Sequence, residues 1–413
     1  MPGQDVSLGE RVAYYRRRRG LSQVVAAQLM GRSEEWLSQV ERGARALDRL
    51  SVIVQLAGVL GVEPVKLLGK PFLDSMPVRT ARRTTVPEHM PAIRRALTRY
   101  EAIDRLLDGS RRQQPPDLAD LRRLIAQAKG YSQTERWSAL APITPGLLED
   151  AHAAVRMYDG RQRQAAYGLL ALAYHVTSGM LDRVGEVDLP WIAAERAMAA
   201  ADRADDPLLG PVCAWRLAVV LRHAGRIEES RDVPLAAADG LRSSLPETGP
   251  ARDSVYGALL LKGAVGASTL ADATGVRDLM READSVAART GDRNDYWFAF
   301  GPTNLAIHRV WLAVEMDDPL DALIRSEDVR LEELPPALAE RKSSHLITVA
   351  WAHHLRRRDH DALNTLRQVR QVAPEQLLFT GRVREMLRLM LKKERRSIRA
   401  DLREMADFVG VLN

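Results

Sequence analysis

Apolar residues recur at three- and four-residue spacing along most of this chain. The pattern is clearest from about residue 92 onward, where Ala, Leu and Arg dominate and the alternation that is typical of strands is almost absent. Such spacing places apolar side chains on one face of a helix. The sequence therefore predicts an all-α protein in which one amphipathic helix follows another.

The predicted helices of this C-terminal region occur in pairs. The pairs are 165–182 with 191–204, 208–224 with 227–241, 255–270 with 276–290, 298–315 with 320–329, and 337–358 with 361–372. They recur at roughly 35 to 40 residues, a period typical of α-solenoids, whose units stack because none can bury its apolar face alone. Residues 217–241 resemble a tetratricopeptide repeat, with small residues where two helices and their turn approach closely. The full Trp, Gly and Tyr signature is missing, so a non-repetitive helical bundle is an alternative.

The N-terminal region shows shorter helical patterns with clear start and stop residues. The predicted helices are 8–19, 22–29 and 33–42, followed by further apolar periodicity up to residue 69. Ser22 and Ser33 suit helix starts, because a hydroxyl oxygen can accept from a free amide of the first turn. Gly20 and Gly43 suit the left-handed position after a helix end. We predict a compact five-helix domain with a core of Leu21, Val25, Ala26, Leu29, Leu37, Val40, Leu50, Ile53, Leu56, Ala57, Leu60, Leu67 and Leu68.

A segment without helical periodicity separates the two regions. Residues 69–91 contain four prolines and three arginines, a composition typical of a linker. We therefore divide the chain into a domain over 1–69, a linker over 70–91, and a tetratricopeptide-like helical repeat domain over 92–413.

The N-terminal helices resemble a known family. The string GLSQVVAAQLMGRSEEWLSQVERG and the later GV-x-P helix start resemble the helix-turn-helix of XRE, or Cro/repressor-type, transcription regulators over about residues 7–69. In that family the third helix enters the major groove of double-stranded DNA. The resemblance implies base contacts from Glu34, Glu35, Ser38 and Gln39, phosphate contacts from Gln23, Arg42, Arg45 and Arg49, and a structural ion pair between Arg16 and Glu41.

Helical spacing independently supports the base-contacting set. Residues 34, 35, 38 and 39 share a face opposite Leu37 and Val40, so they point outward when the apolar pair packs inward. Gln can bond bidentately to adenine, and Glu can accept from the cytosine amine. The two acidic residues also have a second interpretation, because carboxylates in a first turn are favoured by the helix dipole without any DNA. Trp36 also has two interpretations of equal weight: packing in the core, or a contact beside the sugar-phosphate backbone.

Charge distribution and cysteine content limit the classes of protein to which this chain can belong. The first 99 residues carry 17 Lys/Arg against 9 Asp/Glu, a surplus of eight, whereas the whole chain is at +6, so the remainder is at −2. This asymmetry indicates either a polyanion-binding head on a nearly neutral body or a solvated basic face. One cysteine, Cys213, excludes an intramolecular disulfide framework. No signal-peptide pattern and no membrane span are predicted, which indicates a cytoplasmic protein.

One stretch of the repeat region is the best candidate for ligand binding. Four aromatic residues fall within 296–300, in a chain with only 5% aromatic residues. Asn304 and His308 follow at i, i+4 spacing and so share a helix face. An Asn amide can donate and accept at once, which suits it to hold a peptide backbone. The candidate ligand contacts are Trp297, Phe300, Asn304 and His308, with packing between repeats as the alternative.

The motifs of common enzymes are missing. We find no G-x-S-x-G, no GxxxxGK[ST], and no HExxH around His353, His354 and His360, so the sequence predicts no enzyme, cofactor or metal. The chain resembles bacterial regulators that respond to short peptides. We expect a transcription regulator that binds operator DNA as a homodimer, modulated by a peptide, small molecule or protein on its repeats. The alternative is an interaction scaffold whose DNA domain is a weak tether.

Overall fold

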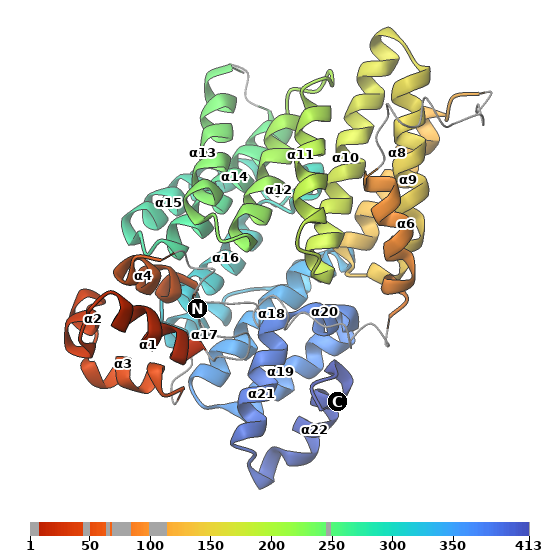
Figure 1. Ribbon diagram of the computed structural model, residues 1–413. Helices are drawn as coiled ribbons and strands as arrows, with labels where there is room; N and C mark the ends of the chain where they lie inside the picture. Colours follow the sequence, from red (N-terminus) through yellow and green to blue (C-terminus); the bar gives the residue numbers. More distant parts are fainter. Residues whose placement is uncertain are drawn as a thin grey trace.

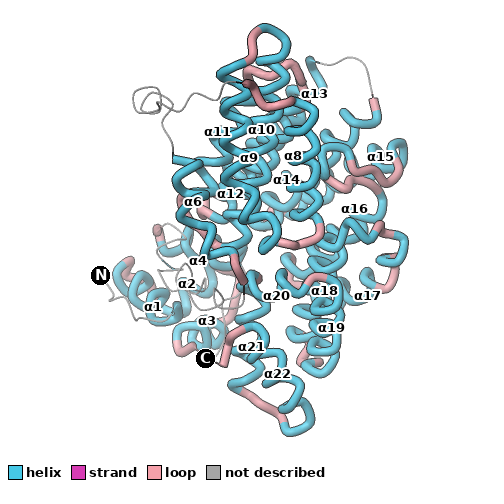
Figure 2. Tube along the Cα trace, turned by 90° about the vertical axis from the view of Figure 1, so that its right-hand side faces the viewer, coloured by secondary structure: helices cyan, strands magenta, loops and turns pink. Residues whose placement is uncertain are grey.

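The computed structural model is all-helical in the parts of the chain that it describes (Figures 1 and 2). The structure describes residues 8–43, 50–62, 67, 84–98, 114–244 and 249–412. No strand occurs within these ranges. The predicted fold class is thus confirmed.

The N-terminal helices follow the predicted order. They are α1 (Leu8–Arg18), α2 (Gln23–Leu29), α3 (Glu34–Glu41) and α4 (Leu50–Leu60). The Oγ atoms of Ser22 and Ser33 accept from the amides of Val25 and Trp36, each at 3.2 Å, so both predicted caps are confirmed. Gly20 and Gly43 adopt φ of +72° and +69°. The fifth predicted helix falls mostly outside the described residues, since only residue 67 of its range is described.

The predicted core of this domain is confirmed in part: Leu21 is only partly buried, and the Leu50 side chain and Leu68 lie outside the described residues. Val25 and Leu29 are 42% and 58% exposed, so both were wrongly assigned to the core. Ala26, Ala27 and Met30 are buried instead. The two alanines allow α2 to lie close against α3, and this rotates the larger side chains outward. The buried members that agree with the prediction are Ala26, Leu37, Val40, Ile53, Leu56, Ala57, Leu60 and Leu67.

Helix α6 (Val86–Thr98) begins inside the segment that we predicted as linker. Val86 is 2% exposed, and Ile93 and Leu97 are fully buried in the first core of the repeat region. Pro87 lies in the first turn, where its missing amide hydrogen has no helical partner to lose. The linker prediction is therefore too long at its C-terminal end, because proline there starts a helix.

The repeat region consists of the predicted helix pairs. They are α10 (Gly160–Val184) with α11 (Leu189–Ala201), α12 (Leu209–His223) with α13 (Ile227–Ser244), α14 (Pro250–Thr269) with α15 (Ala273–Thr290), α16 (Pro302–Glu315) with α17 (Pro319–Ser326), and α18 (Ala339–Leu355) with α19 (Asp359–Val372). The two helices of each pair pack against each other. A preceding pair, which we did not predict, is α8 (Leu118–Gln133) with α9 (Trp137–Met157), and the C-terminal helices are α20 (Pro374–Phe379), α21 (Gly381–Lys392) and α22 (Arg399–Val409).

The first helices of the pairs form an inner layer that closes on itself. Helices α8, α10, α12, α14, α16 and α18 contact one another in this order, and α18 also contacts α8. The amide of Ser138, at the start of α9, donates to Glu375 Oε2 at 2.9 Å across 237 positions of sequence. The solenoid therefore completes a ring, and the inner helices face a common interior.

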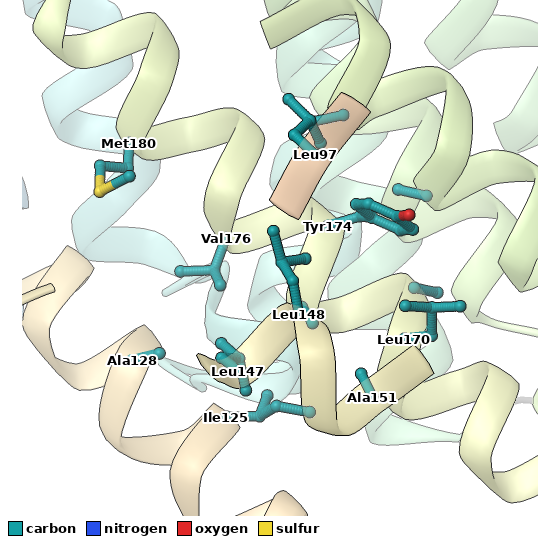
Figure 3. Close-up of a cluster of buried hydrophobic side chains, with 14 of the residues drawn as sticks. Leu97, Ile125, Ala128, Leu147, Leu148, Ala151, Leu170, Tyr174, Val176 and Met180 are labelled. Carbon is teal, nitrogen blue, oxygen red and sulfur yellow. The ribbon is translucent and has the colours of Figure 1, made fainter. Parts of the chain in front are cut away.

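A large apolar core supports the first repeats (Figure 3). Figure 3 shows Ile125 of α8, Leu147 and Leu148 of α9 and Val176 of α10 gathered in one cluster. Leu147 and Leu148 are completely buried. Burying a leucine side chain contributes about 2 kcal/mol, so this cluster fixes the relative positions of the first two pairs.

Candidate DNA-binding surface and ligand-binding region

Helix α3 presents one polar face and one buried face. Trp36, Leu37 and Val40 are 9%, 0% and 2% exposed in the core of the N-terminal domain. The Trp36 ring therefore packs inside, with the Arg32 guanidinium 5.8 Å from its centroid. Glu34 and Glu35 are exposed at the helix start. The face predicted to meet bases is thus on the surface.

Two of the predicted base-contacting side chains are linked to each other. Gln39 Nε2 donates to Glu35 Oε1 at 3.0 Å, and Arg42 Nη2 lies 4.0 Å from the same oxygen. This link orients the Gln39 amide, whose oxygen and second amide hydrogen are left for other partners. Glu34 makes no hydrogen bond or ion pair with a described residue, so its carboxylate is an open acceptor beside them.

The end of α3 is tied to α1 and α2 through Glu41. Arg16 Nε and Nη2 donate to the Glu41 carboxylate at 2.5 and 2.9 Å, which makes the pair bidentate. Gln23 Nε2 donates to Glu41 Oε2 at 2.7 Å. The Arg16 and Glu41 side chains are only 11% and 6% exposed. Because one amide hydrogen of Gln23 is engaged here, the other is the one that can reach a phosphate.

Gly9 was not singled out in the sequence, although it allows α1 to approach α3. A Cβ atom at this position would lie 2.3 Å from the carbonyl oxygen of Val40. No side chain larger than hydrogen fits there without moving a helix. A glycine in the second position of a predicted helix, where it weakens the helix, was the available signal.

The predicted phosphate-contacting arginines are only partly described. Arg42 is exposed at the end of α3, while Arg45 and Arg49 lie outside the described residues. In the preceding arginine run, Arg17 and Arg18 are exposed. Arg19 instead donates to the carbonyl of Gly58 at 3.0 Å, so it stabilises the end of α4. Of the exposed arginines, Arg42 supplies positive charge at the polar face of α3.

Among the described residues, the N-terminal domain contacts the repeats through α4 and through Arg32. Helix α4 packs against α14, and Arg32 Nη2 lies 3.7 Å from Asp317 Oδ2 in the turn between α16 and α17. Both side chains of this pair are about two-fifths exposed, at 41% and 42%. An exposed pair contributes about 0 to 1 kcal/mol, so this ion pair by itself holds the N-terminal domain only weakly against the repeats.

The aromatic segment before α16 is not α-helical, although we predicted a helix from residue 298; a short 3-10 turn, η2 (Asp295–Trp297), lies there instead. Tyr296, Trp297 and Ala299 adopt φ of +49°, +62° and +50°, which is unusual for residues with a side chain. Tertiary contacts hold this shape: Phe300 is fully buried, and a Cβ at Gly257 would lie 1.9 Å from its ring. Arg341 Nη2 donates to the carbonyl of Phe298 at 3.1 Å.

The four candidate ligand contacts therefore have different surroundings. Phe300 belongs to the core, so we withdraw it as a ligand contact. Asn304 is 3% exposed, and its Oδ1 has no hydrogen-bond partner. His308 is partly buried, and its Nδ1 lies 2.9 Å from the Asn304 carbonyl. Trp297 is partly buried, with the Lys129 ammonium 5.3 Å from its ring centroid. The last three lie on or beside the inner layer.

A cluster of basic and aromatic side chains lies on the inner layer, which the sequence analysis missed. We define the Trp215 cluster as Lys129 of α8, His175 of α10, Trp215 and Arg216 of α12, and Lys262 of α14. Burial, with the nearby Arg216, lowers the pKa of Lys129 to about 7. Burial also lowers the pKa of Lys262 well below its usual range. The available signal was a basic residue interrupting an apolar run, as Arg216 and Lys262 both do.

Two other kinds of site are not found in the described part of the chain. There, no three His, Cys, Asp or Glu residues gather into a group that could hold a metal ion. No described helix is both long and apolar enough to cross a membrane.

Comparison with known proteins agrees with this arrangement at the N-terminus. Residues 7–68 match a family model described as a helix-turn-helix domain. No curated protein matches the chain. Among solved structures, the chain is similar to the crystal structure of Bacillus thuringiensis PlcR in complex with the peptide PapR7 and DNA, with 12% identity and a TM-score of 0.37 over 82% of this chain and 98% of that one. The family match at the N-terminus, together with the stacked helix pairs described above, gives an N-terminal helix-turn-helix domain followed by a helical repeat domain.

Proposed function

We propose that this protein is a sequence-specific DNA-binding transcription regulator whose activity is modulated through its helical repeats. Helix α3 enters the major groove, and Glu34, Glu35, Ser38 and Gln39 face the base edges. Arg42, with Arg45 and Arg49, contacts phosphates, as does the second amide hydrogen of Gln23. The protein acts in the cytoplasm, where it has access to the chromosome.

The polar face of α3 is the observation that carries this proposal. It is exposed, while the opposite face is buried through Leu37 and Val40 and the helix end is held by the Glu41 carboxylate. A recognition helix needs this combination, because base readout requires polar groups held in a fixed orientation. The surplus of eight positive charges in residues 1–99 supplies attraction to phosphate that does not depend on sequence.

The protein binds its operator as a homodimer. One α3 helix covers too few base pairs for high specificity, and two-fold symmetric proteins of this kind read inverted repeats. The two half-sites are expected about 34 Å apart, which is one helical turn of B-DNA, or a multiple of that distance.

Competition between DNA sequences tests the proposal. The full-length protein is used to select binding sites from a random duplex library, and the selected inverted repeat is then competed against random duplex at fixed salt. We expect the selected site to be favoured by at least about 10³-fold. Equal affinity for both duplexes would refute sequence-specific regulation and would instead support the scaffold function, with DNA as a weak tether.

The repeats receive the signal through their inner layer. Asn304, His308 and Trp297 lie there, and the unpartnered Oδ1 of Asn304 supports ligand contact, because a buried carbonyl oxygen without a partner is costly. A peptide, a small molecule or a protein segment that binds this layer changes how the two helix-turn-helix domains of the dimer are held relative to each other. Replacing Asn304 by Ala should leave operator affinity unchanged and weaken the response to the ligand.

A further inference from the structure

The inner layer carries more positive than negative charge. Four basic side chains on its helices form no salt bridge with a described residue: Lys129, Arg216, Arg222 and Lys262. Three acidic side chains nearby pair with other arginines, Glu135 with Arg183, Glu315 with Arg382 and Glu340 with Arg341, and Asp182 Oδ1 lies 2.5 Å from His223 Nδ1. A buried basic group without a partner either loses its proton or is compensated by an anion, so these four groups are suited to a partner that the chain itself does not supply.

Several of these basic groups converge on one aromatic ring. The Lys262 ammonium lies 4.3 Å from the ring centroid of Trp215, and the Arg216 guanidinium carbon lies 5.1 Å from it. The His175 ring stacks on the same indole at 6.3 Å with an interplanar angle of 16°. Trp215, Arg216 and Lys262 are partly exposed, so solvent reaches this side of the cluster.

Two buried side chains of the cluster lie behind these groups. Lys129 and His175 are each 4% exposed, and Lys129 Nζ lies 2.6 Å from His175 Nδ1. The other ring nitrogen of His175, Nε2, has no hydrogen-bond partner. Solvent thus reaches the outer side of the cluster, and Lys129 and His175 lie buried behind it.

We propose that the Trp215 cluster binds an organic anion whose negative group lies between Arg216 and Lys262. The ligand is a carboxylate or a phosphate ester, since both pair with guanidinium and ammonium groups. Its apolar part contacts the face of Trp215. This inference rests on the proposed function, because it names the chemistry of the ligand that the repeats receive.

Anion binding at this site is coupled to the uptake of a proton. Burial, reinforced by neighbouring arginines, lowers the pKa of both lysines, and an anion nearby reverses this effect by favouring the charged amine. For Lys129, anion binding is expected to take up a proton in the pH range between its lowered pKa of about 7 and its ordinary pKa of 10.5. The titratable and charged groups that face the two lysines are His175 of α10, Cys213, Arg216 and Arg222 of α12, His308 of α16, and Glu340 and Arg341 of α18.

Calorimetry on the full-length protein tests the inference. Hexaglutamate and inorganic phosphate are titrated separately, at about pH 8 and low salt, in two buffers with different ionisation enthalpies, with hexalysine as the probe of opposite charge. We expect at least one anion to bind with net proton uptake and hexalysine not to bind. The probe that binds identifies the carboxylate or the phosphate as the recognised group.

Three variants locate the site. Lys262→Met and Arg216→Met should each weaken anion binding by about tenfold or more, because each removes a charge-assisted contact. Arg242→Met removes the same charge from an exposed position on α13, where the side chain is 66% exposed, and should leave the affinity unchanged. Equal weakening in all three variants would mean a general charge effect and would overturn the site.

Measurements on the wild-type protein alone can refute the inference. No binding of either anion, or binding without proton uptake, overturns the inference even if a variant does not fold. Sequence-specific DNA binding is measured on the same preparations. Specific DNA binding without anion binding refutes only the ligand chemistry, whereas anion binding without sequence-specific DNA binding refutes the regulator function.

Discussion

Replacing Glu41 by Met should favour local unfolding of helix α3 without affecting the repeats. The carboxylate accepts three hydrogen bonds, two from Arg16 and one from Gln23, and its side chain is 6% exposed. Removing one partner of a buried ion pair leaves the other charge uncompensated, at a cost of about 3 kcal/mol. At that cost the opened state of the N-terminal domain becomes about 150-fold more populated.

Hydrogen exchange read by mass spectrometry measures this opening in the full-length chain. We expect amides of residues 34–41 to lose about a hundredfold in protection, and amides of 250–290 to keep theirs as an internal control. Glu35→Met is the matched control on the same helix. Its side chain is 72% exposed, so that substitution should change the opening free energy by only about 0.5 kcal/mol.

A double-mutant cycle with Arg16→Met isolates the ion pair. If Arg16 and Glu41 stabilise the domain through each other, the double variant should be less destabilised than the sum of the single variants, by about 2 kcal/mol. Additive effects, or unchanged protection in Glu41→Met, would show that the pair does not hold α3 and would refute this reasoning.

Three further predictions concern other parts of the molecule. Glu34→Ala should tighten binding to all duplexes and reduce the preference for the operator by about tenfold if Glu34 reads a base; a change in thermal stability alone would favour the helix-dipole interpretation. Gly9→Ala should destabilise the helix-turn-helix domain by about 1 to 3 kcal/mol in chemical denaturation, because its Cβ would lie 2.3 Å from the Val40 carbonyl oxygen; an unchanged midpoint would contradict that packing. The pKa of Lys129 falls from 10.5 to about 7 on folding, so the unfolded chain binds more protons in that window and stability rises with pH across it. Lys129→Met should therefore stabilise the protein by up to about 5 kcal/mol near pH 7 and make the free energy of unfolding depend less on pH. Parallel plots of the free energy of unfolding against pH for the variant and the wild type would show that the amine is not desolvated.

Local features of the N-terminal domain were predictable because they depend on neighbouring residues. Ser22, Ser33, Gly20 and Gly43 act within one turn of their own helix ends, so residue type and spacing were sufficient. The face of α2 was not predictable, because a helix of seven residues has too few turns for its periodicity to distinguish Val25 from its buried neighbours.

The ligand region was predicted less well because distant contacts determine it. The left-handed backbone at Tyr296 and Trp297 is held by distant contacts, among them that of Phe300 with the space beside Gly257, some forty residues earlier in the chain. The Trp215 cluster combines residues from four helices. A basic residue that interrupts an apolar run, as Arg216 and Lys262 do, does not show which residues will lie beside it, and only the packing of the inner layer brings them together.

Closure of the inner layer also constrains how many repeats this protein can have. An open solenoid can gain or lose a unit at low cost, because each unit contacts only its neighbours. Here α18 meets α8, and Glu375 meets the amide of Ser138. Inserting or deleting one helix pair would move these partners apart by the width of a repeat. The circumference of the closed ring therefore sets the number of helix pairs. Homologous chains that keep this contact should vary in loop length and not in repeat number.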